Sequence, residues 1–551
     1  MWKSAFVALL VLASGAFSAC SQDPGSGPGG EGSPSAGDGT VGALTIGTTA
    51  PNDAFTVFSE SGAFGRMNYN AFVAAPFWTM DGEGKVKPFL VREWEIDPSS
   101  REITARVAVG QGISWHDGRP FTLEDVLFTF DYLMTRTRKS YVADLERVER
   151  LSGDSVKIVL KKPGAYQWIQ LAAGYLTVLP RHVWENVEEP LKFSAPSAAI
   201  GCGPYRLVSV DRDADISVYE AVSESYLGRR LTVRKVILRT YASQDTLVMA
   251  LKRGLADAMY DYSNALEATL APGLQGVEGL DPGMSLNTGN FQIVYGFRSR
   301  PTSDLAFRKA ATLALDYELL RVTIGGGYGL IPGIGVIAPP NIGFDPDLPR
   351  LGRDLAEAAR ALDEAGYRDL DGDGLREGPD GEPLEVSVLP QYNRVKSAVY
   401  LRLCEIVVRN LKDIGIRAAL DGKGASNPDH NAALRKSGSY QIFLGYTSPG
   451  MARQTSAYYY FVDSSVTGQW GTCADPEFMR AYAERKEAAD EGTYVALTGE
   501  LQRINSRLYV AAPLCWNMAF FPYRTDRYEG WENYPGWGPV NAGTWYALRG
   551  K

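Results

Sequence analysis

Residues 115–126 read WHDGRPFTLEDV and contain the most specific signal in the chain. Asp117 and Gly118 favour a tight turn, because an aspartate side chain can cap such a turn and glycine accepts a positive φ. Thr122 and Asp125 form a capping box, in which hydroxyl and carboxylate satisfy the first free N–H groups of a helix. The stretch therefore predicts a tight turn followed at once by a helix.

The histidine of this stretch, His116, has a second interpretation. Histidine is the usual general base of an active site, and His116 stands next to an aspartate. The helix start that follows immediately favours the turn. The chain has three histidines, far apart in sequence, and nothing marks them as a set of metal ligands.

On either side of this stretch, segments with apolar residues at helical spacing alternate with segments in which apolar and polar residues alternate. Apolar residues at helical spacing predict amphipathic helices, whereas alternating polarity predicts half-buried strands. The predicted helices cover residues 122–135, 354–365 and 399–414, and the predicted strands cover 43–48, 102–109, 155–160, 416–420 and 441–444. Such alternation predicts mixed α/β lobes.

Length and charge limit the classes of protein to consider. A chain of 551 residues exceeds the roughly 250–300 residues at which a single core stops growing, so two or three domains are expected. The net charge is −8 and no Lys/Arg tract stands out. A nucleic-acid partner would need a basic face and is therefore not expected.

The N-terminus has the pattern of an export signal. Lys3 precedes the apolar stretch 5–13, which is too short to span a bilayer, since spanning takes about 20 apolar residues. Residues 17–20 read Phe-Ser-Ala-Cys and resemble a lipoprotein cleavage site with Cys20 as the acylated residue, although Phe17 replaces the usual aliphatic residue. A plain secretory signal is the alternative.

A flexible tether is expected to follow this signal. Residues 21–40 are rich in glycine, serine and proline, and no later segment is long and apolar enough to cross a membrane. We therefore expect a signal peptide over residues 1–19, an acylated Cys20 with its linker over 20–40, and an extracytoplasmic protein held at a membrane by lipid.

Several blocks, in order, resemble the extracytoplasmic solute-binding proteins of ABC importers, in the family (family 5) that includes oligopeptide-, dipeptide- and nickel-binding proteins. Trp115 replaces the usual phenylalanine of one block, and Cys202 the usual threonine of another. Together the blocks cover nearly the whole chain from Val41 onward. They are Val86–Trp94, Trp115–Val126, Ile200–Leu207, Leu251–Ala258, Pro301–Leu320, Ala358–Gly374 and Phe478–Pro513.

The resemblance implies an α/β, two-lobed periplasmic-binding-protein fold of type II, with an extra domain on the N-terminal lobe. The implied boundaries are 41–75, 196–290 and 518–551 for lobe I, 76–195 for the extra domain, and 291–517 for lobe II. The resemblance also implies a monomer that encloses a solute between its lobes and delivers it to the permease subunits of an ABC transporter. No cofactor is expected.

Aromatic side chains are the main candidates for contact with that solute. The chain has 11 Trp and 29 Tyr, which stack on sugar rings or peptide side chains when they line a cleft. By resemblance, the regions around 445–453 and 469–471 face the cleft, although any single aromatic side chain also fits a core. The predicted ligand-binding residues are Tyr69, Trp168, Tyr446, Ser448, Arg453, Trp470, Gly471 and Trp516.

The nature of the solute is left open between two classes. Peptide binders of the family commonly carry an aspartate in the segment aligned with 445–449, and this chain has no acid there. Arg298 and Arg453 would suit a carboxylate or phosphate better than an amine, but a surface position is the preferred interpretation of an arginine. A peptide is the first expectation and an oligosaccharide the second; failing both, a metal chelate or opine-like solute would follow.

An acidic loop offers a weak calcium candidate. Its five oxygen donors have the spacing of an EF-hand loop: Asp369, Asp371, Asp373, Glu377 and Asp380. A solvated turn is the alternative and is preferred, because Pro379 and Pro383 oppose a second flanking helix and the last donor is the shorter aspartate. No metal site is therefore predicted.

The remaining cysteines do not define a site. Cys202, Cys404, Cys473 and Cys515 lack zinc-ribbon spacing, and four cysteines allow three disulfide pairings between which the sequence does not choose. Cys404 lies on the apolar face of a predicted helix, which favours a buried thiol.

The sequence favours a binding protein over an enzyme. It contains neither G-x-S-x-G nor H-E-x-x-H, although a carboxylate pair for a secreted hydrolase is not excluded, because 64 acidic residues offer many combinations. A lipoprotein that senses its solute, rather than transporting it, is a further alternative.

Overall fold

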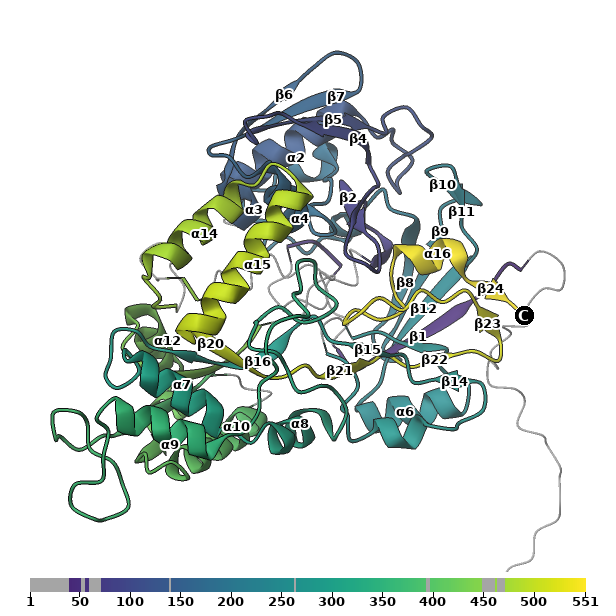
Figure 1. The fold of residues 1–551 in the computed structure, drawn as a ribbon. Helices are drawn as coiled ribbons and strands as arrows, with labels where there is room; N and C mark the ends of the chain where they lie inside the picture. Colours follow the sequence, from purple (N-terminus) through teal and green to yellow (C-terminus); the bar gives the residue numbers. More distant parts are fainter. Residues whose placement is uncertain are drawn as a thin grey trace, which may run out of the picture.

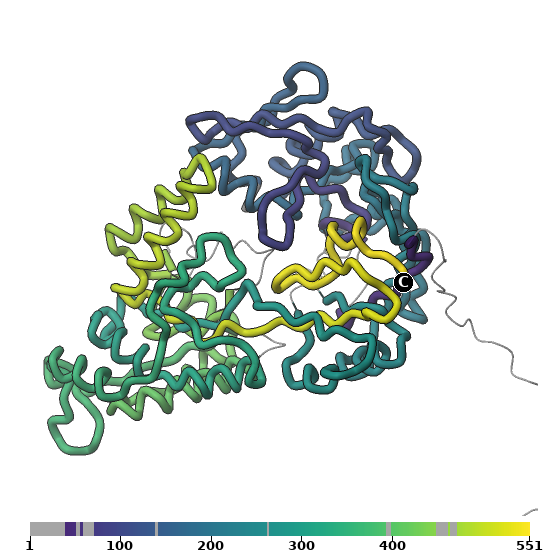
Figure 2. Tube along the Cα trace, turned by 45° about the vertical axis from the view of Figure 1, so that its right-hand side comes forward, coloured from purple at the N-terminus to yellow at the C-terminus, as the bar shows by residue number. Residues whose placement is uncertain are grey.

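A computed structural model describes residues 39–50, 55–58, 71–137, 140–261, 264–392, 397–447, 461–462 and 471–551. Three β-sheets of four or more strands organise these residues (Figure 1). Figure 2 shows the corresponding parts arranged around a common centre, with the four-stranded part at the top and the two larger parts below it.

The first part is built on a seven-stranded sheet in the order β14-β22-β13-β1-β12-β9-β8. The central strand β1 is parallel to β12 and β13, and its residues Leu44 and Ile46 are fully buried. Helix α6 (Gln244–Lys252) packs here through Leu247 and Leu251. The strands are β1 (Leu44–Thr48), β8 (Tyr205–Asp211), β9 (Ile216–Ala221), β12 (Lys235–Thr240), β13 (Ala258–Met259), β14 (Leu280–Asp281) and β22 (Tyr523–Arg524).

The second part is a five-stranded sheet, β18-β17-β19-β16-β20, covered by helices on both faces. Every residue of β16 is buried, and Ile293 packs with α7, α9 and α10 while Val294 packs with α14 and α15. Such burial on both faces explains the continuous apolar strands. The elements are β16 (Asn290–Tyr295), β17 (Val386–Pro390), β18 (Ala418–Leu420), β19 (Ile442–Thr447), β20 (Ala511–Cys515), α7 (Leu305–Ala314), α8 (Tyr317–Gly325), α9 (Leu355–Glu364), α10 (Ser397–Lys412), α11 (Gly422–Ser426), α12 (Pro428–Ser437), α14 (Pro476–Glu487) and α15 (Glu491–Leu508).

The third part is an antiparallel sheet in the order β4-β5-β7-β6. Strand β5 alternates buried Ile103, Ala105 and Val107 with more exposed residues, which is typical of a sheet with one solvated face. Its elements are β4 (Val91–Ile96), β5 (Glu102–Val107), β6 (Leu145–Arg150), β7 (Ser155–Leu160), α2 (Leu123–Arg136), α3 (Ser140–Ala143), α4 (Ala165–Ala172) and α5 (Arg181–Trp184).

Two crossing segments join the seven-stranded and five-stranded parts. The chain leaves β14, passes through β15 (Met284–Leu286) into β16, and later returns from β20 through β21 (Met518–Phe520) to β22. The two segments pair with each other as an antiparallel ribbon, with Ser285 opposite Ala519. A narrow ribbon between two packed bodies is the geometry of a hinge.

Short paired strands and turns complete the described elements. They are β2 (Trp78–Met80) with β3 (Val86–Pro88), β10 (Ser225–Tyr226) with β11 (Arg229–Arg230), β23 (Tyr528–Glu529) with β24 (Arg549–Gly550), helix α16 (Ala542–Ala547), and 3₁₀ turns at Pro196–Ala199 and Ala271–Leu274.

The predicted local structure and the mixed α/β class are confirmed. The capping box at Thr122 is formed, because Asp125 accepts from the Thr122 backbone N–H at 2.9 Å, and α2 follows it. Asp354 caps α9, and the helix predicted over 399–414 is α10. No helix within the described residues has the length and apolarity to cross a membrane.

His116 belongs to a structural turn. Its backbone N–H donates to Gly201 O at 2.9 Å, and its Nε2 lies 3.1 Å from Gly203 O. Burial lowers the pKa of His116 to about 4, so the imidazole is neutral at physiological pH. Gly203 in turn packs against the backbone of residues 73–74, since a Cβ there would lie 2.5 Å from Ala74 O. The turn interpretation therefore accounts for this histidine.

Candidate functional site

The candidate site lies where the crossing ribbon meets the five-stranded sheet. Phe291 of β16 is opposite Tyr446 of β19 on one side and Cys515 of β20 on the other. This register brings Tyr446 and Trp516, two of the predicted ligand-binding residues, to the same end of the sheet. They are 70 residues apart in sequence, and only the strand pairing unites them.

Tyr446 is held by the crossing segment. Its ring lies 4.7 Å from the ring of Phe291, and its hydroxyl hydrogen-bonds to the side chain of Asn287, which follows β15. The Tyr446 backbone N–H also donates to Gln391 Oε1 at 2.9 Å. Burial raises the pKa of the Tyr446 hydroxyl well above its ordinary value, so the group stays neutral.

Trp516 offers a buried donor. The side chain is 7% exposed and packs edge-to-face on Phe344 at 5.3 Å, while its backbone pairs with Leu330. Its buried Nε1 has no hydrogen-bond partner among the described residues, and neither has Oδ1 of the adjacent Asn517. A buried polar atom left without a partner costs about 1–3 kcal/mol, so both atoms are suited to meet a polar ligand or a bound water.

Neutral polar groups also lie at this end of the sheet among the described residues. Asn290 donates from Nδ2 to Val336 O at 3.1 Å, and Asn341 donates to Thr288 O at 3.0 Å. Thr447 Oγ1 accepts from the Asn290 backbone N–H at 3.3 Å. These amides and hydroxyls fix the start of β16, and they suit hydrogen bonds to uncharged ligand groups.

The other predicted ligand-binding residues lie elsewhere or outside the described residues. Trp168, on α4, is 2% exposed and packs edge-to-face on Trp78 at 6.0 Å, within the core of the four-stranded part. The backbone of Gly471 lies against that of Phe461, where a Cβ on Gly471 would be only 2.3 Å from the Phe461 backbone. Outside the described residues are Tyr69, Ser448, Arg453, Trp470 and the lipidation candidate Cys20.

Sequence reasoning missed the amides that accompany Tyr446 and Trp516. Asn287, Asn290 and Asn517 lie on the crossing segments or at the start of β16, and they read as ordinary polar residues in the sequence. The one signal was the position of Asn517 beside a predicted ligand-binding residue, Trp516.

A second contact joins the four-stranded part to the five-stranded part, away from the ribbon. Tyr166 of α4 donates its hydroxyl proton to Glu491 at 3.1 Å, and its ring lies 5.3 Å from Tyr494. Ser100 donates to Ala488 O at 3.3 Å. A Cβ on Gly164 would lie 2.7 Å from Lys486 O, so the two backbones approach as closely as a glycine allows. Figure 1 shows α14 and α15 beside α4.

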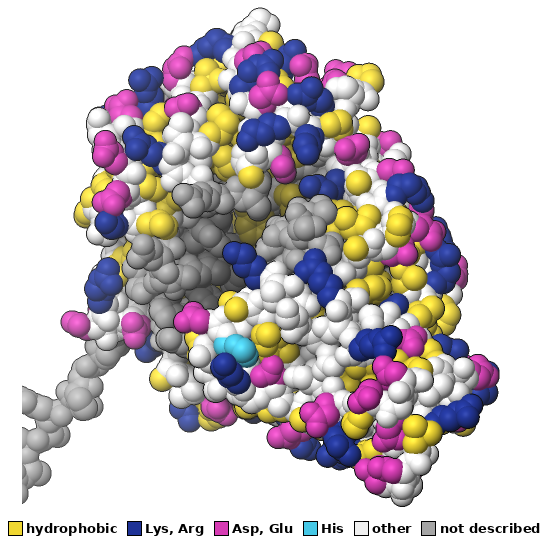
Figure 3. All heavy atoms as spheres, turned by 90° about the vertical axis from the view of Figure 1, so that its left-hand side faces the viewer, with side chains coloured by type: hydrophobic (Ala, Val, Ile, Leu, Met, Phe, Trp, Pro, Cys, Tyr) yellow, Lys and Arg dark blue, Asp and Glu magenta, His cyan; other side chains and the backbone are white. Residues whose placement is uncertain are grey.

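The molecular surface is hollowed on the face shown in Figure 3. Apolar side chains and lysine or arginine side chains both appear among the described residues around the hollow. This face of the molecule therefore has a concave region, as a small-molecule site requires.

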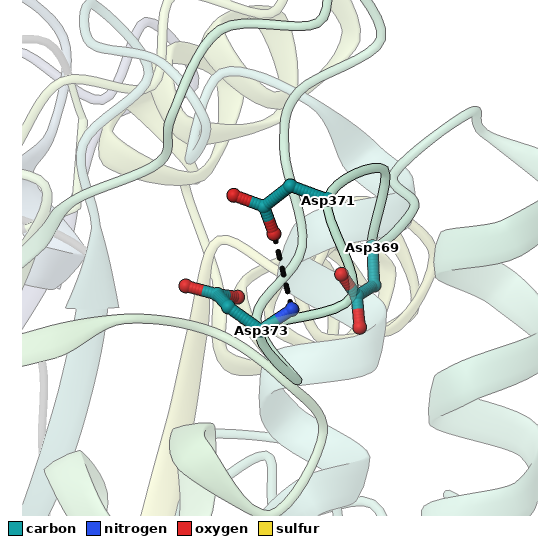
Figure 4. Close-up of side chains that lie close together, drawn as sticks. All are labelled: Asp369, Asp371 and Asp373. Atoms are coloured by element: carbon teal, nitrogen blue, oxygen red, sulfur yellow. Dashed lines mark hydrogen bonds between the residues drawn. The ribbon is translucent and has the colours of Figure 1, made fainter.

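In the acidic loop, three of the five oxygen donors predicted for calcium lie close together. One carboxylate oxygen from each of Asp369, Asp371 and Asp373 lies within 4.8 Å of the others (Figure 4). Glu377 instead accepts from the Leu370 backbone N–H, and Asp380 accepts from Arg300 at 2.6 Å. Residues 369–374 are exposed, and their carboxylates accept backbone N–H groups, as in a solvated turn.

The four cysteines of the body are buried thiols: Cys202, Cys404, Cys473 and Cys515. Burial raises the pKa of the Cys515 thiol to about 12 and that of Cys202 well above its ordinary value. Buried thiols of this kind are unreactive.

Two α/β bodies joined by a two-stranded ribbon define the class of two-lobed periplasmic-binding-protein folds of type II. A sequence model of the family described as bacterial extracellular solute-binding proteins, family 5 Middle, matches residues 85–469. The chain belongs to this family, and it is therefore a solute-binding protein and not an enzyme.

Curated relatives agree over part of the chain. A putative binding protein of Brucella melitensis is 27% identical over 235 residues, which are 39% of this chain and 37% of that protein. A putative ABC transporter peptide-binding protein of Brucella ovis is 25% identical over 366 residues, which are 63% of this chain and 62% of that protein. The chain thus matches less than two thirds of the length of each relative.

Solved structures share the fold over nearly the whole chain. A periplasmic oligopeptide-binding protein of an ABC transporter from Thermotoga maritima has a TM-score of 0.74 at 21% identity, covering 92% of this chain and 99% of that one. The same protein with bound mannohexaose has a TM-score of 0.66 at 21% identity, covering 92% and 98%. NikA from Brucella suis, in complex with Fe(III)-EDTA, has a TM-score of 0.75 at 20% identity, covering 92% and 100%.

Proposed function

We propose that this protein is the substrate-binding lipoprotein of an ABC importer, which captures a peptide-like solute and delivers it to a membrane permease. In this proposal the seven-stranded part is lobe I (41–75, 196–290 and 518–551), the five-stranded part is lobe II (291–517), and the four-stranded part is the extra domain (76–195). The observation that carries it is the antiparallel ribbon of β15 and β21, beside which Trp516 and Asn517 hold buried polar atoms without partners among the described residues.

Capture follows from this arrangement. The ribbon is the only connection by chain between the two large sheets in the described residues, so rotation about it changes the space between them. A solute that hydrogen-bonds to Trp516 Nε1 and Asn517 Oδ1 removes the desolvation penalty of both atoms. These hydrogen bonds contribute most when closure of the lobes excludes competing water. Bound solute therefore favours the closed arrangement.

A peptide-like solute is supported by the Brucella ovis relative, whose name is that of a peptide-binding protein. An oligosaccharide is the second candidate, because the described polar groups at this end of the sheet include amides and hydroxyls, which suit sugar hydroxyls, and Trp516 and Phe344 provide aromatic surface. The mannohexaose complex of the Thermotoga maritima protein shows that this fold accommodates such a ligand.

The lipid anchor rests on the sequence of the N-terminus. Cys20 follows small residues after an apolar stretch, and a glycine-, serine- and proline-rich linker follows it. Mass spectrometry of the protein extracted from membranes tests this point. Acylation lost in Cys20→Ser supports the anchor, whereas an unmodified Cys20 or cleavage at another residue rejects it.

Thermal-shift screening with separate peptide and oligosaccharide pools tests the class of solute. A ligand that binds only the folded state raises the melting temperature, by an amount that depends on its concentration relative to the Kd. A shift with one pool assigns the solute to that class, and no shift with either rejects both. Solute recovered unchanged and in equal molar amount from the protein supports capture, whereas turnover argues for a hydrolase.

A further inference from the structure

A separate pocket of about 450 Å³ lies where three distant segments of the chain meet. These segments are residues 79–92, the end of the β10–β11 turn at 227–229, and residues 532–547 around α16. Phe89, Tyr534 and Tyr546 form buried walls of the pocket. Neither Tyr446 nor Trp516 lines it, so it is distinct from the junction of the two large sheets.

Two arginines give this pocket its chemistry. Arg92 and Arg229 both line it, and neither has a carboxylate within 4.0 Å among the described residues. The Arg229 guanidinium carbon lies 3.9 Å from the centre of the Tyr546 ring, while the Arg92 guanidinium makes one long hydrogen bond, 3.4 Å, to Phe89 O. Most of the donors of both planar guanidinium groups therefore remain available.

The acids of the pocket do not cancel these two charges. Asp81 is paired with Lys87 at 3.0 Å and also accepts the backbone N–H groups of Glu83 and Lys85. Glu532 is the one remaining carboxylate of the lining, so the two arginines leave an excess of one positive charge.

Tyr546 is the aromatic wall of the pocket against which Arg229 stacks. Burial raises the pKa of its hydroxyl to about 12, against the opposing effect of Arg229 and Arg92. The hydroxyl is therefore a neutral donor, and the described residues provide it with no hydrogen-bond partner.

We propose that this pocket binds a small solute through an oxyanion group, a carboxylate or a phosphate, held by Arg92 and Arg229 with the Tyr546 hydroxyl as a further donor. Guanidinium groups match the planar or tetrahedral oxygens of such anions with paired hydrogen bonds. The bound anion would connect β4 of the four-stranded part with β11 and α16 of the seven-stranded part, and so stiffen their contact. This site functions independently of the solute captured at the ribbon.

Isothermal titration calorimetry on the full chain tests the proposal, with inorganic phosphate and propionate as probes and with sodium chloride holding the ionic strength constant. We expect saturable binding at one site per chain. Arg92→Gln and Arg229→Gln should each weaken it by about tenfold, because each removes a charge-assisted hydrogen-bonding group. Arg212→Gln, which removes an exposed arginine outside the pocket that likewise lacks a carboxylate partner among the described residues, should bind as the unaltered protein does.

Tyr546→Phe provides a variant that retains the ring beneath Arg229 and removes only the donor, and it should weaken binding by about fivefold. Binding of phosphate alone would assign the site to phosphate esters, and binding of both probes would assign it to oxyanions in general. The proposal is overturned if neither probe shows saturable binding. It is also overturned if Arg92→Gln and Arg229→Gln bind the probes as tightly as Arg212→Gln does. Urea unfolding of each variant shows whether a loss of binding reflects a loss of folding.

Discussion

The contact between Tyr166 and Glu491 makes lobe closure measurable, because the two residues belong to different parts of the molecule. Tyr166→Phe removes the 3.1 Å hydrogen bond and leaves the ring packed 5.3 Å from Tyr494. A hydrogen bond to a charged group contributes about 1.5–3 kcal/mol, and the exposure of Glu491 reduces this to about 1 kcal/mol. If the contact forms only on closure, the Kd for the captured solute should rise about fivefold.

Calorimetry with the solute recovered from the protein measures this change, and Tyr132→Phe is the matched control. Tyr132 donates its hydroxyl proton to Val187 O at 2.7 Å, a bond that lies wholly within the four-stranded part. Tyr132→Phe should lower the free energy of unfolding by about 1 kcal/mol and leave the Kd unchanged. An unchanged Kd in Tyr166→Phe, or an equal rise in both variants, would refute the role of this contact in closure.

Three further substitutions test the contact between the parts, the donor of Trp516 and the buried histidine of the turn. Gly164→Ala places a Cβ 2.7 Å from Lys486 O and should weaken solute binding. Gly153→Ala is the control, because Gly153 also has a positive φ but a Cβ there meets no atom within 4 Å. Equal Kd values for the two variants, measured by calorimetry, would contradict the role of this contact. Trp516→Phe removes a buried donor that lacks a partner among the described residues and should raise the Kd about tenfold. The smaller ring also leaves a gap beside Phe344, so urea unfolding measures the packing loss separately; destabilisation with an unchanged Kd would show a packing role alone. The pKa of His116 is lowered from 6.5 to about 4 in the folded state, so the unfolded chain binds the proton more tightly. The free energy of unfolding should therefore fall by about 2–3 kcal/mol as the pH falls from 6.5 to 4. Urea unfolding of His116→Gln should show a smaller fall over this range, and a pH profile identical to that of the unaltered protein would contradict the assignment.

Local structure was predictable because its causes lie within a few residues. The capping box at Thr122 and the apolar face of α10 depend on spacings of three or four positions, and both elements formed where expected. The alternation of helices and strands likewise indicated the mixed α/β class. The family resemblance added the expectation of two lobes, which strand spacing alone did not contain.

The candidate site was predictable only in part, because it depends on pairings between distant strands. Tyr446 and Trp516 meet through the register of β16, and Asn287 reaches Tyr446 from a crossing segment about 160 residues earlier. Trp168 illustrates the converse: an aromatic residue in an unremarkable stretch packs against Trp78 in a core. A single sequence does not distinguish these two environments.

The most direct test of solute capture is native mass spectrometry of the protein purified without denaturation. Solute capture predicts one small solute per chain, released unchanged when the protein unfolds and rebound by the emptied protein at the same stoichiometry. A protein that carries no solute and rebinds none from peptide or oligosaccharide pools, or one that converts the solute to a product, would contradict it.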